Sequence, residues 1–206
     1  MSNEKNKISN EELLDFLKFS YFGDLNISIE VASNRAYRDM CRTIKFNKLK
    51  DITDRRKLRD KVNIIFETEI KKFTSGSKKN PDDFNNWLGE VYENMKNLYE
   101  ENGIKLTYGQ AQKWINMTIK YLYLFGGYTF DSVFEELHVP VDNYILDIAN
   151  KKLGIDKPKK PWSKWDEEQY RNYQNEIKSK IKIAPLIWEF KNWLNEAEKE
   201  AQKVKK

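Results

Sequence analysis

The sequence predicts an all-α protein, and three observations lead to that prediction. Apolar residues recur at steps of three and four along nearly all of the 206-residue chain, which is the spacing of one helix face. Strict alternation of apolar and polar residues, which is typical of strands, is hard to find. Aromatic residues make up 14% of the chain, too many for a disordered protein although 33% of residues are charged. We therefore expect a compact fold of about eight to ten helices with a central apolar helix.

The length of the chain predicts one globular unit over residues 1–206, or two helical lobes over about 1–103 and 104–198. The Lys- and Glu-rich end should fray as a basic tail. Cys41 and His138 are the only cysteine and histidine, which excludes an internal disulfide and a zinc site of four Cys/His ligands. His138 would be the only imidazole for a Ser-His or Cys-His catalytic arrangement. We expect no metal and no organic cofactor.

No run of residues approaches the ~18 apolar positions of a membrane span, and the first residues lack the apolar core of a signal peptide. The chain is therefore expected to be a soluble, cytoplasmic monomer with no membrane partner. Lys and Arg number 37 against 32 Asp and Glu, so the net charge is +5. This mild basic bias permits a polyanionic partner such as DNA without establishing one.

The first two helices are expected before residue 50. Ser9 and Glu12 form a capping box for a short helix that ends near Gly23. Residues from about 27 to 46 keep one apolar face and predict an amphipathic helix with a basic exterior. Cys41 falls in the middle of this second helix, where it should pack in the core.

The next two helices flank a loop at residues 74–79. The third begins near Asp54, and its first turns are rich in Arg and Lys, which opposes the helix dipole there. The fourth begins at Asn80-Pro81, a strong start signal, and ends near Gly103. The basic residues at the start of the third helix that could contact DNA phosphates are Arg55, Arg56 and Arg59.

Residues 108–125 predict the central helix, with Thr107 as its N-cap. Apolar side chains surround most of this helix, which is typical of a helix enclosed by protein. Only a narrow polar strip interrupts them, and it carries Lys113, Asn116 and Lys120. We expect the strip to open on one side of the buried helix and to present two amines there.

After Gly126-Gly127, a short helical piece through Val133 and Phe134 is expected. Pro140 then suits a helix start, and Asp142 just beyond it can accept backbone N–H bonds at that terminus. Asp142 could have no role other than that of an acidic residue at a helix N-terminus. Lys113, considered alone, could be an ordinary lysine at a helix edge.

Two further helices complete the chain. A loop at residues 154–161 contributes Lys159 and Lys160 as candidate phosphate contacts. Ser163 can cap the helix that follows, and Pro185 opens the last helix, which carries Trp188.

The segment QAQKWINMTIKYL at residues 110–122, followed by PVDNYIL at 140–146, resembles the catalytic segments of the helix-hairpin-helix DNA glycosylases. The resemblance is closest to the 8-oxoguanine DNA glycosylase/lyases of archaeal type. PLIWEF at residues 185–190 is similar to the family's C-terminal helix. The resemblance covers about 45 residues well and about 80 loosely.

This resemblance implies a DNA glycosylase/AP lyase that acts on an oxidised or modified base such as 8-oxoguanine. Lys113 would be the nucleophile that forms a Schiff base, and Asp142 would assist it. Lys120 would be a second cation that lowers the pKa of Lys113. The target base must leave the duplex to be reached. The residues expected around that base are Trp188, Trp114, Asn116, Lys120 and Pro140.

The chain departs from the family's pattern in two places. No clear glycine-rich hairpin of the LPGVG kind is present, and residues 106–109 are at best a degenerate relative. Ala184 lies four residues before Trp188, where some relatives have an acid that reads the base.

Two alternatives remain open on the sequence. The chain could be a non-catalytic helical module, in host defence or regulation, whose basic surface binds a nucleic acid or an acidic protein. It could also keep the family fold while being inactive, or act on an unusual phage or host base.

Overall fold

The computed structural model describes residues 7–47, 49–75 and 80–204. Over these residues it contains helices and no strand, which confirms the all-α prediction. The α-helices are α1 (Asn10–Phe22), α2 (Ile29–Met40), α3 (Ile52–Thr74), α4 (Pro81–Glu101), α5 (Tyr108–Phe125), α6 (Asn143–Leu153), α7 (Glu167–Lys180) and α8 (Pro185–Val204). Three short 3₁₀ helices join them: η2 (Cys41–Thr43), η3 (Phe134–Glu136) and η4 (Trp162–Lys164).

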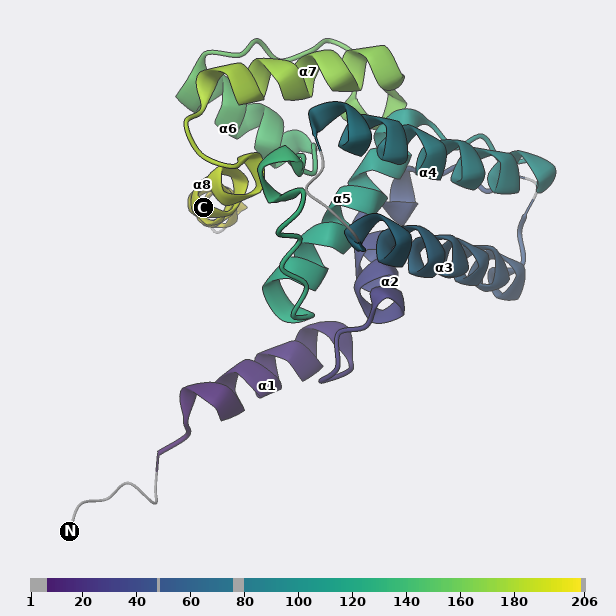
Figure 1. The fold of residues 1–206 in the computed structure, drawn as a ribbon, viewed down its shortest axis with the longest axis horizontal. Helices are drawn as coiled ribbons and strands as arrows, with labels where there is room; N and C mark the ends of the chain where they lie inside the picture. Colours follow the sequence, from purple (N-terminus) through teal and green to yellow (C-terminus); the bar gives the residue numbers. More distant parts are fainter. Residues whose placement is uncertain (1–6, 48, 76–79, 205–206) are drawn as a thin grey trace.

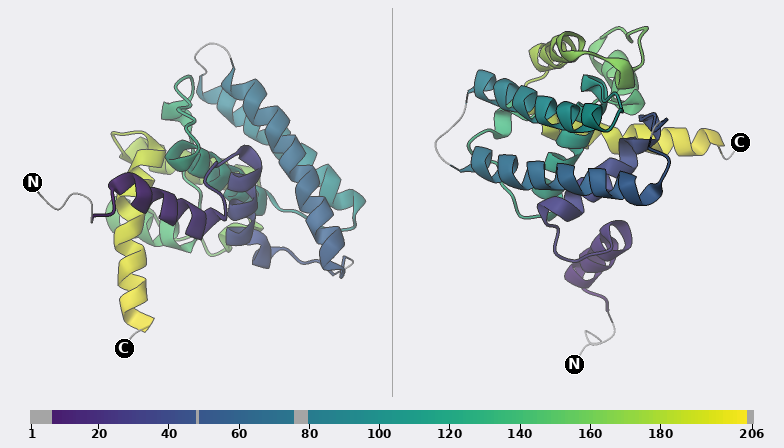
Figure 2. Two further views of the ribbon diagram at one scale, coloured as in Figure 1. Left: turned by 90° about the horizontal axis from the view of Figure 1, so that it is seen from below. Right: turned by 90° about the vertical axis from the view of Figure 1, so that its right-hand side faces the viewer.

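Helix α5 is the central helix, as predicted (Figure 1). Every residue from Tyr108 to Leu122 is buried, and the helix packs against α2, α4, α7 and η4. Trp114 fixes its contact with α2, because the indole N–H donates to the Ser33 carbonyl at 3.0 Å and to its hydroxyl at 2.9 Å. Figures 1 and 2 show α3 and α4 on one side of α5, and α6 and α8 on the other.

The predicted capping residues are confirmed for three helices. Ser9, Asn80 and Thr107 each accept a bond from the backbone N–H of the third helical residue, whose side chain bonds back to the cap backbone. Gly23 ends α1 in the left-handed conformation, with φ of 80°. Local side-chain chemistry therefore determines where these helices begin.

Other helix ends differ from the predictions. Helix α2 ends at Met40, so Cys41 lies at its C-terminus, half-buried against the core, and residues 41–43 turn into η2. Helix α3 begins at Ile52, near the predicted start, and Asp51 caps it by accepting the Thr53 N–H at 2.6 Å. Helix α8 continues to Val204.

Two proposed helix starts were wrong. Pro140 does not open α6; Asp142 is its N-cap and accepts the backbone N–H of Ile145 at 3.0 Å. Ser163 does not cap α7, because it lies within η4 and Asp166 takes the capping position. The predicted role of Asp142 as the acid that accepts backbone N–H bonds at this terminus is confirmed. At α7, serine and aspartate are about equally good caps, and the structure uses Asp166.

Gly109 allows α5 and η4 to pack closely. A Cβ atom at this position would lie 1.9 Å from the Trp162 carbonyl oxygen, and the Gly109 N–H donates to the Trp165 carbonyl at 3.0 Å. The degenerate hairpin at residues 106–109 is therefore covered by protein. Its glycine serves this helix contact.

We expect Gly109→Ala to destabilise the fold by about 3 kcal/mol, because backbone must move to relieve the clash. Urea unfolding would measure the loss. Gly89→Ala on α4 is the matched control, since its Cβ would find only the tips of Glu167 and Arg171 at 3.6 and 3.7 Å. That change should be neutral or stabilise the helix by up to about 1 kcal/mol. An equal effect of both substitutions would contradict this account.

Among the described residues, no helix is both long and apolar enough to cross a membrane.

Candidate active site around Lys113 and Asp142

The structure brings Lys113 and Asp142 together. The Lys113 amine donates to Asp142 Oδ2 at 2.7 Å and to the Pro140 carbonyl at 3.2 Å. The Lys113 side chain is 6% exposed and that of Asp142 is 18% exposed, so the pair reaches the surface only at the carboxylate. Asp142 uses its other oxygen to cap α6. The carboxylate is therefore held by a helix N-terminus on one side and by an amine on the other.

Two buried glutamines hold the segment that carries Asp142. Gln112 on α5 donates to the Val141 carbonyl at 3.0 Å and accepts the Val141 N–H at 3.2 Å. Gln174 on α7 makes the same pair of bonds with Val139, at 2.7 and 3.2 Å. Each side-chain amide thus pairs with the extended backbone as a neighbouring strand would. This arrangement fixes Pro140 and Asp142 beside Lys113.

A second buried ion pair lies on the same face of α5. The Lys120 amine is 2.7 Å from Glu189 Oε1, and the two side chains are 9% and 2% exposed. Among the described residues, Glu189 Oε2 has no hydrogen-bond partner. Burial raises the pKa of Glu189, while the charges of Lys120 and Lys113 oppose that rise. The four charged groups therefore form one electrostatic cluster with no net formal charge.

The sequence interpretation missed two residues of this site, Glu189 and Trp193. Glu189 follows Trp188 directly, and only the packing of α8 on α5 shows that it pairs with Lys120. Trp193, one turn further along α8, places its ring 5.5 Å from the Lys120 amine and 6.0 Å from the Tyr144 ring. The spacing of Glu189 and Trp193 by four residues places both on one helix face, which is the signal that could have identified them.

His138 belongs to a polar chain beside the site. Its Nδ1 lies 2.9 Å from the Tyr170 hydroxyl, which accepts from the Asn116 amide at 2.7 Å. His138 is half-buried, and the centre of its ring lies 4.9 Å from the centre of the Phe84 ring. Burial, assisted by the charges of Lys178 and Arg171, lowers the pKa of His138 to about 3. The Tyr170 hydroxyl can therefore donate to a neutral imidazole.

We expect His138 to stay neutral in the folded protein at neutral and mildly acidic pH. In the unfolded chain an imidazole titrates at about pH 6.5, whereas the folded protein keeps His138 neutral to lower pH. As pH falls below about 6.5, protonation therefore favours the unfolded state, and the free energy of unfolding decreases. The ring-proton shifts of the single histidine, followed by NMR, should stay flat between about pH 5 and about pH 8. A titration step within that range would show that the ring is not enclosed as described.

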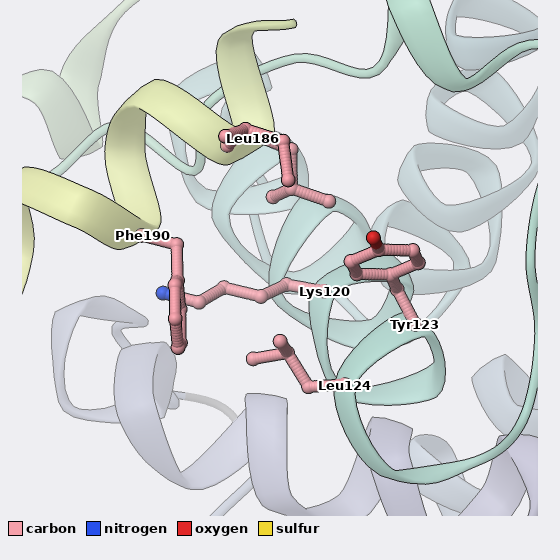
Figure 3. Close-up of a pocket in the computed structure, with 6 residues that line it drawn as sticks. Lys120, Tyr123, Leu124, Leu186 and Phe190 are labelled. Atoms are coloured by element: carbon pink, nitrogen blue, oxygen red, sulfur yellow. The ribbon is translucent and has the colours of Figure 1, made fainter.

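A small cavity adjoins Lys120 between α5 and α8 (Figure 3). Its volume is about 190 Å³, and its lining is mostly apolar. The Lys120 side chain extends across it from α5 toward Phe190 of α8 (Figure 3). The residues that line it are Lys120, Tyr123, Leu124, Leu186, Ile187 and Phe190.

The expected opening of the polar strip was wrong. Lys113, Asn116 and Lys120 are 5%, 2% and 7% exposed, because α6, α7 and α8 cover that face of α5 and supply partners for all three side chains. Trp188 is buried, and Trp114 is fully buried among aromatic rings of the core. Neither indole is available to stack on a base in this arrangement.

The basic residues proposed for DNA contacts do not surround the site. Helix α3, with Arg55, Arg56 and Arg59, lies across α5 from α6 and α8 (Figures 1 and 2). Arg55 donates to the Leu49 carbonyl at 2.7 Å, and Arg59 pairs with Asp60. These two side chains therefore stabilise the start of α3.

The loop residues are closer to the second half of the chain. Lys160 bonds Gln169 at 2.6 Å and pairs with Asp166 at 3.3 Å, whereas Lys159 is exposed. Lys160 thus secures the start of α7. In the described part of the chain, no group of three or more His, Cys, Asp and Glu side chains is placed to hold a metal ion.

Comparison of the chain with protein-family models, with curated proteins and with solved structures finds no match.

Proposed function

We propose that this chain is a DNA glycosylase with AP-lyase activity on an oxidised or otherwise modified base, such as 8-oxoguanine. The observation that carries the proposal is a nearly buried amine, Lys113, held 2.7 Å from the carboxylate of Asp142 at a helix N-terminus. This is the residue pair that the resemblance to helix-hairpin-helix glycosylases singles out. The fold itself would then be a variant of that family's fold.

The pair can supply both the nucleophile and the proton acceptor. Asp142 Oδ2 takes a proton from Lys113, and the free amine attacks C1′ of the sugar as the glycosidic bond breaks. The base leaves with the bonding electrons and takes up a proton. Opening of the sugar ring gives a Schiff base, and loss of a 2′ proton then expels the 3′ phosphate. Asp142 would also stabilise the positive charge that develops on the sugar.

Attack on C1′ requires the Lys113 amine to become accessible. The Asp142 edge is the exposed end of the pair, and Tyr144 and Trp193 lie at the same surface, both partly exposed. Trp193 is 36% exposed, compared with 7% for Trp188. We therefore assign the base-stacking role to Trp193 in this proposal, and we expect DNA to separate α8 from the α5–α6 surface there.

Borohydride trapping tests the proposal directly. Purified protein is incubated with borohydride and duplexes that carry 8-oxoguanine, an abasic site or no lesion. A Schiff base is reduced to a stable covalent adduct, so we expect capture on the first two duplexes and none on the third. Absence of capture on both damaged duplexes would overturn the lyase mechanism.

A non-catalytic binding module is the second candidate function. It is favoured by one specific observation, that both buried lysines already have carboxylate partners within 2.7 Å. Buried ion pairs of this kind can have a purely structural role, which here would be to specify how α6 and α8 pack on α5. Equal binding of damaged and undamaged duplexes, measured by fluorescence anisotropy and without trapping, would support this candidate.

A further inference from the structure

Helix α1 carries its apolar side chains on the outside. None of its residues is buried, and the helix stands apart from the body beside α2 (Figures 1 and 2). Its half-buried residues are Asp15, Lys18 and Phe22, so the more polar side faces the protein. The apolar side chains that are 42–79% exposed on α1 and next to it are Ile8, Leu13, Leu14, Phe16, Leu17, Phe19, Tyr21 and Leu25. This reverses the usual amphipathic arrangement of a surface helix.

Specific contacts at its C-terminal end hold α1 in this orientation. The Tyr21 hydroxyl lies 2.8 Å from that of Tyr121 on α5, and Tyr121 donates to Asp39 on α2 at 2.6 Å. Arg35 packs its guanidinium 4.0 Å from the centre of the Tyr21 ring and pairs with Asp39 at 2.9 Å. Phe22 packs its ring edge against Tyr121 at 5.3 Å. The apolar face is therefore presented outward by a defined anchor.

The exposed area matches what a protein interface requires. A large apolar side chain buries on the order of 200 Å². The eight side chains, which are 42–79% exposed, therefore offer on the order of 800 Å². A standard interface buries about that much on each partner. A monomer seldom leaves so large an apolar patch in water.

The charge of α1 argues against a membrane as its partner. Helices that lie on membranes carry Lys and Arg on their polar face. Helix α1 instead carries Glu11, Glu12 and Asp15 against a single Lys18. A protein surface that is apolar and accommodates acidic flanks fits it better.

We propose that this surface binds a second copy of the chain, with α1 packed antiparallel against α1 of the partner around a two-fold axis near Leu17. Such an arrangement makes each apolar face the complement of the other. It keeps the acidic first halves of the two helices apart, and it opposes the two helix dipoles favourably. A parallel pair would place the acidic halves together. The sequence predicts a monomer, and α1 is the feature that leads us to a dimer.

Sedimentation velocity of the full chain tests the dimer. We expect a concentration-dependent species at twice the 24.7 kDa of one chain. Leu17→Glu, at a position 53% exposed, should give a monomer without loss of folding, whereas Ile64→Glu on α3, at a position 67% exposed, should leave the dimer intact. A wild-type monomer at about 100 μM would overturn the proposal, because only millimolar association would then remain. Binding of the wild-type monomer to anionic vesicles would overturn it as well.

Cysteine pairing tests the antiparallel arrangement. Leu14→Cys and Ser20→Cys, both at exposed positions away from the anchor, are each made in a Cys41→Ser background and then mixed under mild oxidation. Antiparallel packing about Leu17 places residue 14 of one helix beside residue 20 of the other, so we expect mixed disulfides to exceed either self-pair severalfold. Preferential self-pairing of each variant would indicate a parallel arrangement and contradict the proposal. Neither experiment depends on enzymatic activity, so failure of the dimer and failure of the proposed chemistry are distinguishable.

Discussion

Replacement of Lys113 by glutamine is expected to abolish borohydride capture on abasic DNA, a loss of roughly 1,000-fold or more. The amine is the only group of the Lys113–Asp142 pair that can form a Schiff base, and glutamine cannot replace it. Glutamine is one bond shorter than lysine, but it keeps an N–H donor directed toward the Pro140 carbonyl and Asp142, the two partners of the lysine. The fold should therefore survive, and circular dichroism and urea unfolding should confirm this before activity is compared.

Lys120→Gln is the matched control for this variant. Lys120 lies on the same helix, is similarly buried and is paired with a carboxylate at the same distance of 2.7 Å. If Lys113 is the nucleophile, capture should persist in Lys120→Gln at a reduced rate at most. Loss of capture in both variants while both remain folded would show that the substitutions disturb the site as a whole, and the assignment of Lys113 would lose its support.

Asp142→Asn separates the two roles of the carboxylate. Asparagine is as good an N-cap as aspartate, so α6 should keep its start. It cannot take a proton from Lys113, however, and it brings no charge to the developing cation. We expect slower capture by about 100-fold with stability changed by less than about 1 kcal/mol. Unchanged capture would mean that Asp142 serves only as a cap.

The sequence could predict most helices because the signals that define them are local. The capping boxes at Ser9, Asn80 and Thr107 depend on residues three positions apart, and each begins a helix as expected. The start of α7 was misplaced because Ser163 and Asp166 are both good caps. The choice between them depends on η4, which packs on Gly109 of α5. That contact joins residues far apart in the sequence.

The candidate site divides in the same way. Lys113 and Asp142 could be named from their local pattern, and the structure places them in contact. The burial of the polar strip could not be predicted, because Glu189 and Tyr170 reach α5 from segments 69 and 54 residues away. Helix periodicity shows that a strip is polar but not what covers it. The same limit applies to α1, where the sequence predicts a capped helix but not that its apolar side chains point outward.

Removal of the Lys120 amine should produce the largest loss of stability of any change at this site. Lys120→Met leaves the Glu189 carboxylate, 2% exposed, without its only hydrogen-bond donor among the described residues. Breaking one side of a buried ion pair costs about 3–5 kcal/mol, because a charge then remains in an apolar environment. Urea unfolding of the purified variant would measure the loss. A change below about 1 kcal/mol would show that water reaches Glu189 once the amine is gone.

The pH dependence of this loss identifies its cause. Burial already raises the pKa of Glu189, and removal of Lys120, which opposes that rise, should raise it further. A carboxyl group with a raised pKa binds its proton more tightly in the folded state, so stability increases as pH falls. The deficit of Lys120→Met should therefore shrink between about pH 8 and about pH 5. Lys120→Met/Glu189→Leu should recover most of the stability at both values, because it removes the unpaired charge and fills the space with apolar atoms. A double variant as unstable as the single one would place the loss in packing of the lysine stem, and not in the charge of Glu189.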